Sequence, residues 1–181
     1  MDIVYKVCCG LDVHKKTIVA CIIKNKSRET VTFGTMTANI IELTDWIKSN
    51  SCEAVAMEST GVYWKSIYNL LELENITTLV VNAKHMKAVP GRKTDVKDAE
   101  WIAELLQHGL LKGSFIPSRE QRELRELVRY RRSIIQERYR EVARIQKILE
   151  GANIKLSSVA SNIMGVSGRN MLNSIVEGNK S

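Results

Sequence analysis

The fold is decided by an apolar run, Val4-Tyr5-Lys6-Val7-Cys8-Cys9-Gly10-Leu11, which is followed directly by Asp12. Such a run predicts a buried strand over residues 3–11. A second run, Ala54-Val55-Ala56-Met57, predicts another buried strand and is followed by Glu58. A charge is out of place beside a buried strand, and in open α/β sheets binding sites gather beyond the carboxyl ends of the strands. Asp12 and Glu58 are therefore candidate site residues.

Two further strands follow the first, with only short polar turns between them. They are predicted at residues 17–23 and 29–35. Short turns join antiparallel strands, so the three strands predict a meander. The first turn carries His14, which we interpret as a solvated side chain in preference to a ligand or a proton carrier.

The region after this meander alternates helix and strand. Apolar residues at helical spacing predict helices from about residue 39, after Gly61 and from Asp95, and a short strand is predicted at 77–81. Three antiparallel strands followed by helix, strand, helix, strand and helix form the ribonuclease H-like class of α/β folds, a mixed five-stranded sheet with flanking helices. The first and fourth strands of that arrangement are adjacent and parallel, so their carboxyl ends would bring Asp12 and Glu58 together.

The helix after Gly61 is preceded by Ser59, which invites interpretation as a nucleophile. The sequence has no G-x-S-x-G setting around it and no evident histidine to orient it. Helix capping and turn formation explain the Ser59-Thr60-Gly61 stretch better. The apolar face of this helix is expected to comprise Tyr63, Ile67, Leu70 and Leu71.

The stretch Lys93-Thr94-Asp95-Val96-Lys97-Asp98-Ala99 supplies two more acids. If Asp95 opens a helix, Asp98 lies on the same face one turn later. Taken alone, acids in a first helical turn are explained by capping and by the helix dipole. Together with Asp12 and Glu58, however, they make four oxygen ligands that suit a hard cation such as Mg²⁺ or Mn²⁺.

Residues 118–150 contain neither proline nor glycine and predict one helix about 50 Å long. Its apolar residues alternate spacings of four and three, which is typical of a coiled-coil seam interrupted by Arg131 and Arg138. The predicted seam comprises Leu124, Val128, Arg131, Ile135, Arg138, Val142, Ile145 and Leu149. Residues 119–150 hold ten basic residues against six glutamates, which indicates either a solvated face or a stalk that follows phosphates.

Charge and composition limit which partners the chain can have. The 181 residues carry a net charge of +7, which favours polyanionic partners, and the 44% hydrophobic content contains no run near the ~20 residues of a membrane span. No secretory signal is evident. The cysteines lack metal-site spacing and predict core thiols in a reducing compartment. They are Cys8, Cys9, Cys21 and Cys52.

We expect three regions: a catalytic domain at 1–116, a helical stalk at 117–153, and short helices at 154–181 around 156–164 and 167–176. Nucleic-acid contacts are predicted in the basic loop before Asp95, beside Asp12 and on the stalk. The candidates are Lys15, Lys84, Lys87, Arg92, Lys93, Arg129 and Arg132.

Three ordered signatures give the chain a family resemblance. They are Gly10-Leu11-Asp12-Val13-His14-Lys15, Glu58-Ser59-Thr60-Gly61-Val62-Tyr63-Trp64 and Arg92-Lys93-Thr94-Asp95-Val96-Lys97-Asp98-Ala99. With them the chain resembles the N-terminal part of the DEDD transposases of bacterial insertion sequences of the family numbered one hundred and ten.

This resemblance implies a RuvC-like nuclease domain in which Asp12, Glu58, Asp95 and Asp98 are the catalytic, magnesium-binding tetrad. It also implies a DNA recombinase that is guided by a structured RNA. The coiled-coil pattern of the long helix predicts a homo-oligomer that pairs through the stalk, and the expected location is the bacterial cytoplasm. In the family a second domain carries a serine nucleophile; the sequence stops before that domain, and Ser167 is not that serine. We therefore expect binding of nucleic acid, without complete recombination by this chain alone.

Two other classes of function compete with a transposase. One is a resolvase-like or exonuclease-like nuclease with the same four acids, and the other is a non-catalytic fragment that binds nucleic acid or dimerises. A sugar-kinase-like fold shares the core topology, but the sequence lacks a second core and a glycine-rich phosphate loop.

Overall fold

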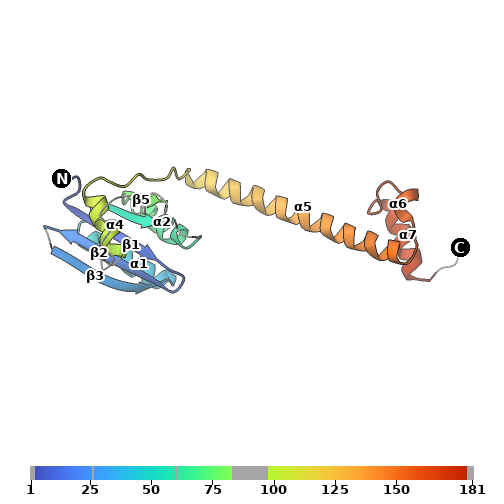
Figure 1. The fold of residues 1–181 in the computed structure, drawn as a ribbon, viewed down its shortest axis with the longest axis horizontal. Helices are drawn as coiled ribbons and strands as arrows, with labels where there is room; N and C mark the ends of the chain where they lie inside the picture. The colour runs from blue at the N-terminus through green and yellow to red at the C-terminus, as the bar shows by residue number, and fades with distance from the viewer. Residues whose placement is uncertain (1–2, 26, 60, 83–97, 179–181) are drawn as a thin grey trace. The chain divides into compact units, whose positions relative to one another are not determined.

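The computed structural model describes residues 3–25, 27–59, 61–82 and 98–178. The chain divides into two compact units, residues 1–116 and 117–181, which are described separately below. The first unit contains β1 (Val7–Val13), β2 (Thr17–Lys24), β3 (Ser27–Gly34), α1 (Thr37–Ser49), β4 (Ala54–Glu58), α2 (Trp64–Leu73), β5 (Thr78–Val81) and α4 (Asp98–Gln107) (Figure 1).

The sheet of the first unit has the strand order β3-β2-β1-β4-β5. β1 pairs antiparallel with β2, and β2 with β3, so the predicted meander is confirmed. β1 pairs in parallel with β4, and β4 with β5. This mixed five-stranded sheet with flanking helices has the ribonuclease H-like topology expected from the sequence.

The first strand begins later than its apolar sequence predicts. Strand pairing starts at Val7 and runs to Val13, so the predicted span of 3–11 is wrong at both ends. The reason lies at the end of α4, where the backbone N–H groups of Val4 and Tyr5 donate to the carbonyl oxygen of Gln107 at 2.8 and 3.3 Å. The segment before β1 therefore satisfies an orphan carbonyl of a helix instead of extending the sheet.

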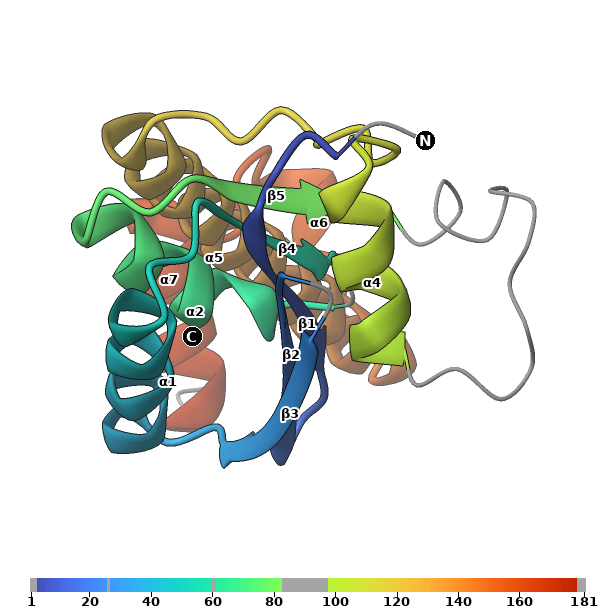
Figure 2. The same cartoon turned by 90° about the vertical axis from the view of Figure 1, so that its left-hand side faces the viewer.

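The two faces of the sheet are covered by different helices (Figure 2). Cys9, Leu11 and Met57 point to the face that packs against α1 and α2. Cys8 and Ala56 point to the opposite face, which packs against Ala99, Ile102, Ala103 and Leu106 of α4. Because side chains alternate along a strand, β1 and β4 bury both faces, and this explains their continuous apolar sequences.

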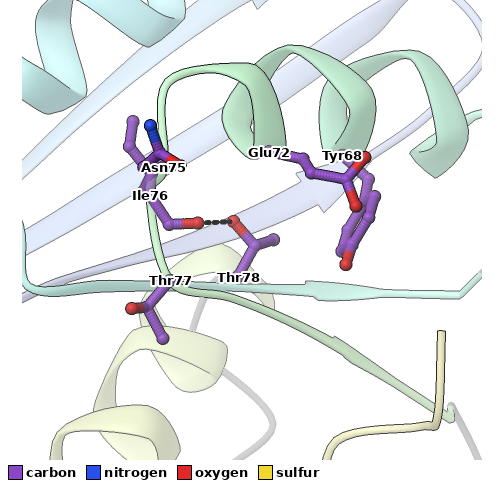
Figure 3. A pocket seen from close by; sticks show the side chains of 6 residues that line it. All are labelled: Tyr68, Glu72, Asn75, Ile76, Thr77 and Thr78. Atoms are coloured by element: carbon purple, nitrogen blue, oxygen red, sulfur yellow. Dashed lines mark hydrogen bonds between the residues drawn. The ribbon is translucent and has the colours of Figure 1, made fainter. Parts of the chain in front are cut away.

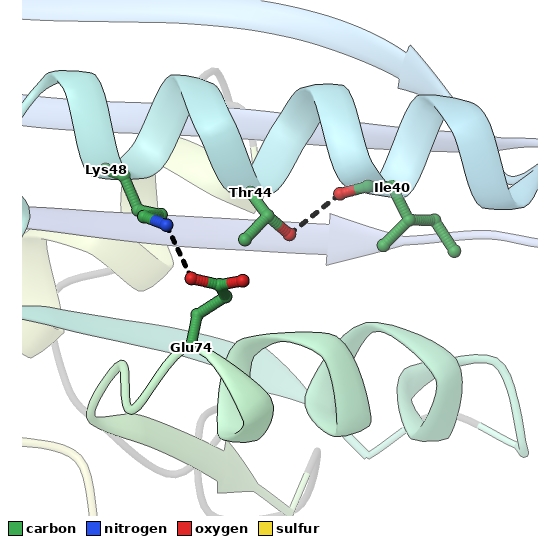
Figure 4. Close-up of polar contacts among 4 residues, drawn as sticks. All are labelled: Ile40, Thr44, Lys48 and Glu74. Atoms are coloured by element: carbon green, nitrogen blue, oxygen red, sulfur yellow. Dashed lines mark hydrogen bonds and ion pairs between the residues drawn. The ribbon is translucent and has the colours of Figure 1, made fainter.

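The helices α1 and α2 are tied together at one end by an ion pair between Lys48 and Glu74 (Figure 4). The hydrogen bond and the charge of Glu74 raise the pKa of Lys48. One turn earlier on α1, the buried Thr44 hydroxyl donates to the carbonyl oxygen of Ile40 at 2.8 Å and so has a partner. The ion pair thus joins the end of α1 to the end of α2.

All four cysteines are free thiols, as predicted. Cys8, Cys9 and Cys21 are buried in the sheet, and Cys52 is half-buried. Burial raises the pKa of Cys8 and of Cys52 to about 12. These thiols are therefore packing residues with little thiolate at neutral pH.

The second unit is built on one long helix. It contains α5 (Arg119–Gly151), α6 (Leu156–Val159) and α7 (Val166–Val176). The predicted long helix is confirmed, whereas the helix expected at 156–164 is shorter. A small cluster of Leu149, Leu156 and Ile163 is buried where these helices meet. On α5, Leu124 and Val128 are 62% and 58% exposed, so the coiled coil stays a prediction.

Across the part of the chain that the structure describes, no helix is both long enough and apolar enough to span a membrane.

Candidate functional site

The candidate site lies where β1 and β4 end. Leu11 pairs with Met57 in the parallel register, and the next residue of each strand is Asp12 or Glu58. The carboxyl ends of parallel neighbours meet at one edge, so these two acids lie on adjacent strands at the same level. The Asp12 side chain is 21% exposed, and Glu58 is half-buried. The sequence-based expectation for this pair of strands is therefore met.

Asp12 is held by a neighbour in the turn that follows it. The Nε2 atom of His14 lies 3.0 Å from the Oδ2 atom of Asp12. The turn itself is fixed, because the N–H of His14 donates to the Thr17 carbonyl oxygen at 2.9 Å and the Thr35 hydroxyl donates to the Lys15 carbonyl oxygen at 3.1 Å. His14 is 62% exposed, as expected, but it also orients the Asp12 carboxylate, which our interpretation of the sequence missed.

Glu58 sits in a similarly fixed backbone. It pairs with Val81 of β5, and the N–H of Ser59 donates to the Val81 carbonyl oxygen at 2.9 Å. The prediction that Ser59 caps the next helix is wrong, because Tyr63 is the residue at the N-cap of α2. The turn between them is confirmed by Gly61, whose φ of 56° lies in the left-handed region that glycine adopts readily.

Asp98 is the first residue of α4 and is exposed. The direction of α4 follows from its contacts, because Gln107 at its end bonds the segment just before β1. α4 therefore runs against β1, and its first turn lies toward the end of β1 that carries Asp12. The buried Ala99 and Ala103 stripe is confirmed, and the predicted Tyr63 contribution to the α2 face is wrong because Tyr63 is 40% exposed.

Gly10 is the residue that lets α4 approach the sheet. A Cβ atom on Gly10 would lie 2.3 Å from the carbonyl oxygen of Ala99 and 2.4 Å from the backbone nitrogen of Ala103. Any side chain here would push the helix outward. The sequence does hold a signal for this contact, namely a glycine inside a strand and two alanines one helical turn apart.

Two contacts with β3 fix the rotation of α4. The Thr30 hydroxyl donates to Glu100 at 3.5 Å, and Arg28 forms an ion pair with Glu104 at 3.4 Å. Glu100 and Glu104 are four residues apart and lie on one side of the helix. The helix is therefore held on the side facing β3 as well as at Gly10.

Several predicted residues fall outside the described residues. They are Asp95, Lys84, Lys87, Arg92 and Lys93. Within the described ranges, no group of three or more His, Cys, Asp or Glu side chains is placed to hold a metal ion. The structure thus brings Asp12 and Glu58 to one edge and directs the first turn of α4 toward it, and carboxylate oxygens are donors that fit a hard divalent cation.

A pocket occurs elsewhere on the first unit (Figure 3). It is lined by Tyr68, Glu72, Asn75, Ile76, Thr77 and Thr78. Thr78 begins β5, so this pocket lies at the amino end of the strand, whereas the acids lie at the carboxyl ends. It is therefore separate from the candidate site.

Comparison with known proteins gives a family match over most of the chain. A family model described as a transposase, of the DEDD type of IS110 insertion sequences, matches residues 9–154. The pilin gene-inverting proteins of Moraxella lacunata and Moraxella bovis are 29% and 28% identical over 103 residues. That match covers 52% of this chain and 32% of each relative. The chain thus spans about a third of the length of the curated relatives that it matches.

Solved structures with a similar arrangement include RuvC of Thermus thermophilus. Its complex with a Holliday junction substrate has a TM-score of 0.44 and 10% identity, and the match covers 60% of this chain and 99% of that one. A second structure of Thermus thermophilus RuvC gives a TM-score of 0.43 and 11% identity with the same coverage.

Proposed function

Because the chain belongs to the DEDD transposase family of IS110 insertion sequences, we propose that its first unit is a metal-dependent catalytic domain that acts on phosphodiester bonds during DNA transposition. Family membership supports transposase or recombinase chemistry in general. The dependence on a metal, the identity of the ligands and the partners belong to the proposal.

The observation that carries the proposal is that Asp12 and Glu58 lie at the same edge of the sheet, on adjacent parallel strands. Two carboxylates at adjacent ends of parallel strands repel each other unless a cation lies between or beside them. The packing of α4 on Gly10, with Asp98 in its first turn, supports a third carboxylate on the same side. By family resemblance Asp95 is the fourth acid of the set.

In this proposal Asp12, Glu58, Asp95 and Asp98 hold Mg²⁺ or Mn²⁺. Bound divalent cations would activate a water and offset the charge that develops on the phosphate oxygens. The protein supplies the placement of the carboxylates. His14 keeps one oxygen of Asp12 engaged, which leaves the other free to face a ligand.

We propose that DNA is the substrate and that a structured guide RNA binds the same chain. Cations near the acids would hold the phosphates, beginning with Lys15 in the turn after Asp12. Further cations are proposed from the sequence alone at Lys84, Lys87, Arg92 and Lys93, which lie outside the described residues. The RNA partner is carried over from the family resemblance.

We further propose that α5 pairs with a second copy of itself. Leu124 and Val128 are more than half exposed in the single chain, and Ile135 continues the same spacing. An isolated apolar stripe along a 33-residue helix favours burial against another helix. Complete strand exchange would, as the resemblance implies, also require a serine nucleophile from a second domain.

Cleavage of DNA tests the catalytic proposal. The 181-residue chain is incubated with supercoiled plasmid and with a branched DNA, with Mn²⁺, Mg²⁺ or EDTA. Slow nicking that needs the metal and is lost in Glu58→Gln is expected, while Glu29→Gln, an exposed acid of β3, serves as the matched control.

One alternative function is supported by a separate observation. The arginine-rich α5 favours a module that binds nucleic acid without cleaving it, in which the acids are structural. Binding with no metal-dependent nicking in any condition would favour this module and count against the catalytic proposal.

A further inference from the structure

The arginines of this chain are concentrated on one element. Nine of its twelve arginines lie in α5, together with a single lysine, whereas lysine outnumbers arginine elsewhere. The two residues have similar helix propensity, so helix formation does not explain the choice. The planar guanidinium group binds phosphate through two parallel hydrogen bonds, which the lysine ammonium group does not.

The charges of α5 are sorted by face. A row at spacings of three and four, from Arg122 to Lys147, contains cations and no acid, and we call it the basic face. Its members are Arg122, Arg125, Arg129, Arg132, Gln136, Arg140, Ala143 and Lys147. At 3.6 residues per turn the centre of this row lies about 135° around the helix from the centre of the predicted seam, where Arg131 and Arg138 are found.

Five of the six acids of α5 lie on a different side of the helix, and the sixth, Glu150, follows the row after Lys147. Glu123 forms an ion pair with Arg119, and Glu141 forms one with Arg144. The structure assigns no acidic partner to Arg125, Arg129, Arg132 or Arg140 among the residues it describes, and all four are exposed. Arg122, at the start of the basic face, donates to the carbonyl oxygen of Pro117 at 2.7 Å, so the cations left for an external anion are those from Arg125 onward.

We propose that the basic face of α5 binds the phosphate backbone of a nucleic-acid duplex. The row runs from Arg122 to Lys147, a rise of about 38 Å along the helix, which is close to one helical turn of duplex DNA. Arg129, Arg140 and Lys147 lie on the far side from the predicted seam, and Arg125 and Arg132 lie at its flank, so a paired stalk would still present the row to solvent. This contact involves neither the acids of the sheet edge nor a metal ion.

Binding of labelled duplexes of random sequence tests the proposal. Fluorescence anisotropy is recorded in EDTA over a range of salt concentrations, with a DNA duplex in one arm and an RNA duplex in the other. The loss of nicking activity would not affect this measurement, so the two proposals fail independently.

The decisive comparison uses two pairs of substitutions, each spaced seven residues apart. Arg125→Gln with Arg132→Gln removes two cations from the basic face, and Arg131→Gln with Arg138→Gln removes two from the seam. The first pair should weaken binding of at least one duplex several-fold and lower the logarithmic salt slope by about two. The second pair should change the slope by much less.

Circular dichroism should show unchanged helix content in both variants, because glutamine is as good a helix former as arginine. Equal loss of binding in the two variants would overturn the proposal, because binding would then depend on the total charge of the helix and not on the face that carries the charge. Poly-glutamate that binds as tightly as the duplexes would overturn the assignment to phosphate.

Discussion

Gly10 of β1 lies directly against Ala99 of α4, so that a Cβ at residue 10 would be 2.3 Å from the Ala99 carbonyl oxygen. This contact sets the distance between the helix that begins with Asp98 and the strand that carries Asp12. The obstructing atoms are backbone, which cannot move without shifting the whole helix.

Gly10→Ala should therefore displace α4. Overpacking of this kind costs about 1–3 kcal/mol, and thermal unfolding should show the loss as a lower Tm. Gly113→Ala is the matched control, because a Cβ there would meet only the Leu79 side chain, at an ordinary 3.6 Å. Equal Tm values for the two variants would show that α4 has no close contact at Gly10.

His14 should act as a positioning residue for Asp12. Because its imidazole holds Oδ2, His14→Ala should let the carboxylate rotate and weaken Mn²⁺ binding by about tenfold, as for other partners of metal ligands. His14→Gln retains a hydrogen-bond donor and should recover much of the affinity. Calorimetric titration measures both, and identical affinities for wild type and His14→Ala would remove this role.

The seam of α5 should control the oligomeric state. Val128→Asp with Ile135→Asp would place two charges in a buried apolar interface. Light scattering should then show monomers. Gln136→Asp with Ala143→Asp has the same spacing and charge on another face, and this pair should leave the oligomer intact. A monomeric wild type at high concentration would contradict self-association through α5.

The thiols should react slowly in the folded chain. Burial holds the pKa of Cys8 and Cys52 near 12, well above the ordinary 9.0, so little thiolate exists at pH 8. Labelling with an alkylating reagent should be slow in buffer and fast in urea, as followed by mass spectrometry. Rapid native labelling of Cys8 would mean that the sheet opens locally at β1.

The strand order could be predicted from the sequence because each element carries its own local signal. The continuous apolar runs of β1 and β4 indicated strands buried on both faces, and the short polar turns indicated the meander. The ends of the elements were harder, because tertiary contacts decide them. Val4 and Tyr5 have strand-like sequence, yet their N–H groups bond Gln107 at the end of α4.

The candidate site was predictable only in part. Asp12 and Glu58 could be paired from sequence, since register along parallel strands follows from the fold. The contact between His14 and Asp12 depends on a turn that Thr35 and Thr17 fix from elsewhere in the chain. The positions of the charges on α5 were present in the sequence. They can be assigned to separate faces only because residues 119–151 form one continuous helix.

The central claim, that the acids at the sheet edge bind a divalent cation, is tested most directly by thermal unfolding with and without Mn²⁺ or Mg²⁺. The Tm of the wild type should rise with metal concentration, because a ligand that binds the folded state stabilises that state. Asp12→Asn with Glu58→Gln should lose that gain, although relief of repulsion should make the variant at least as stable without metal. Glu29→Gln should behave as the wild type does. Equal metal-induced shifts in the wild type and the double variant would contradict the account.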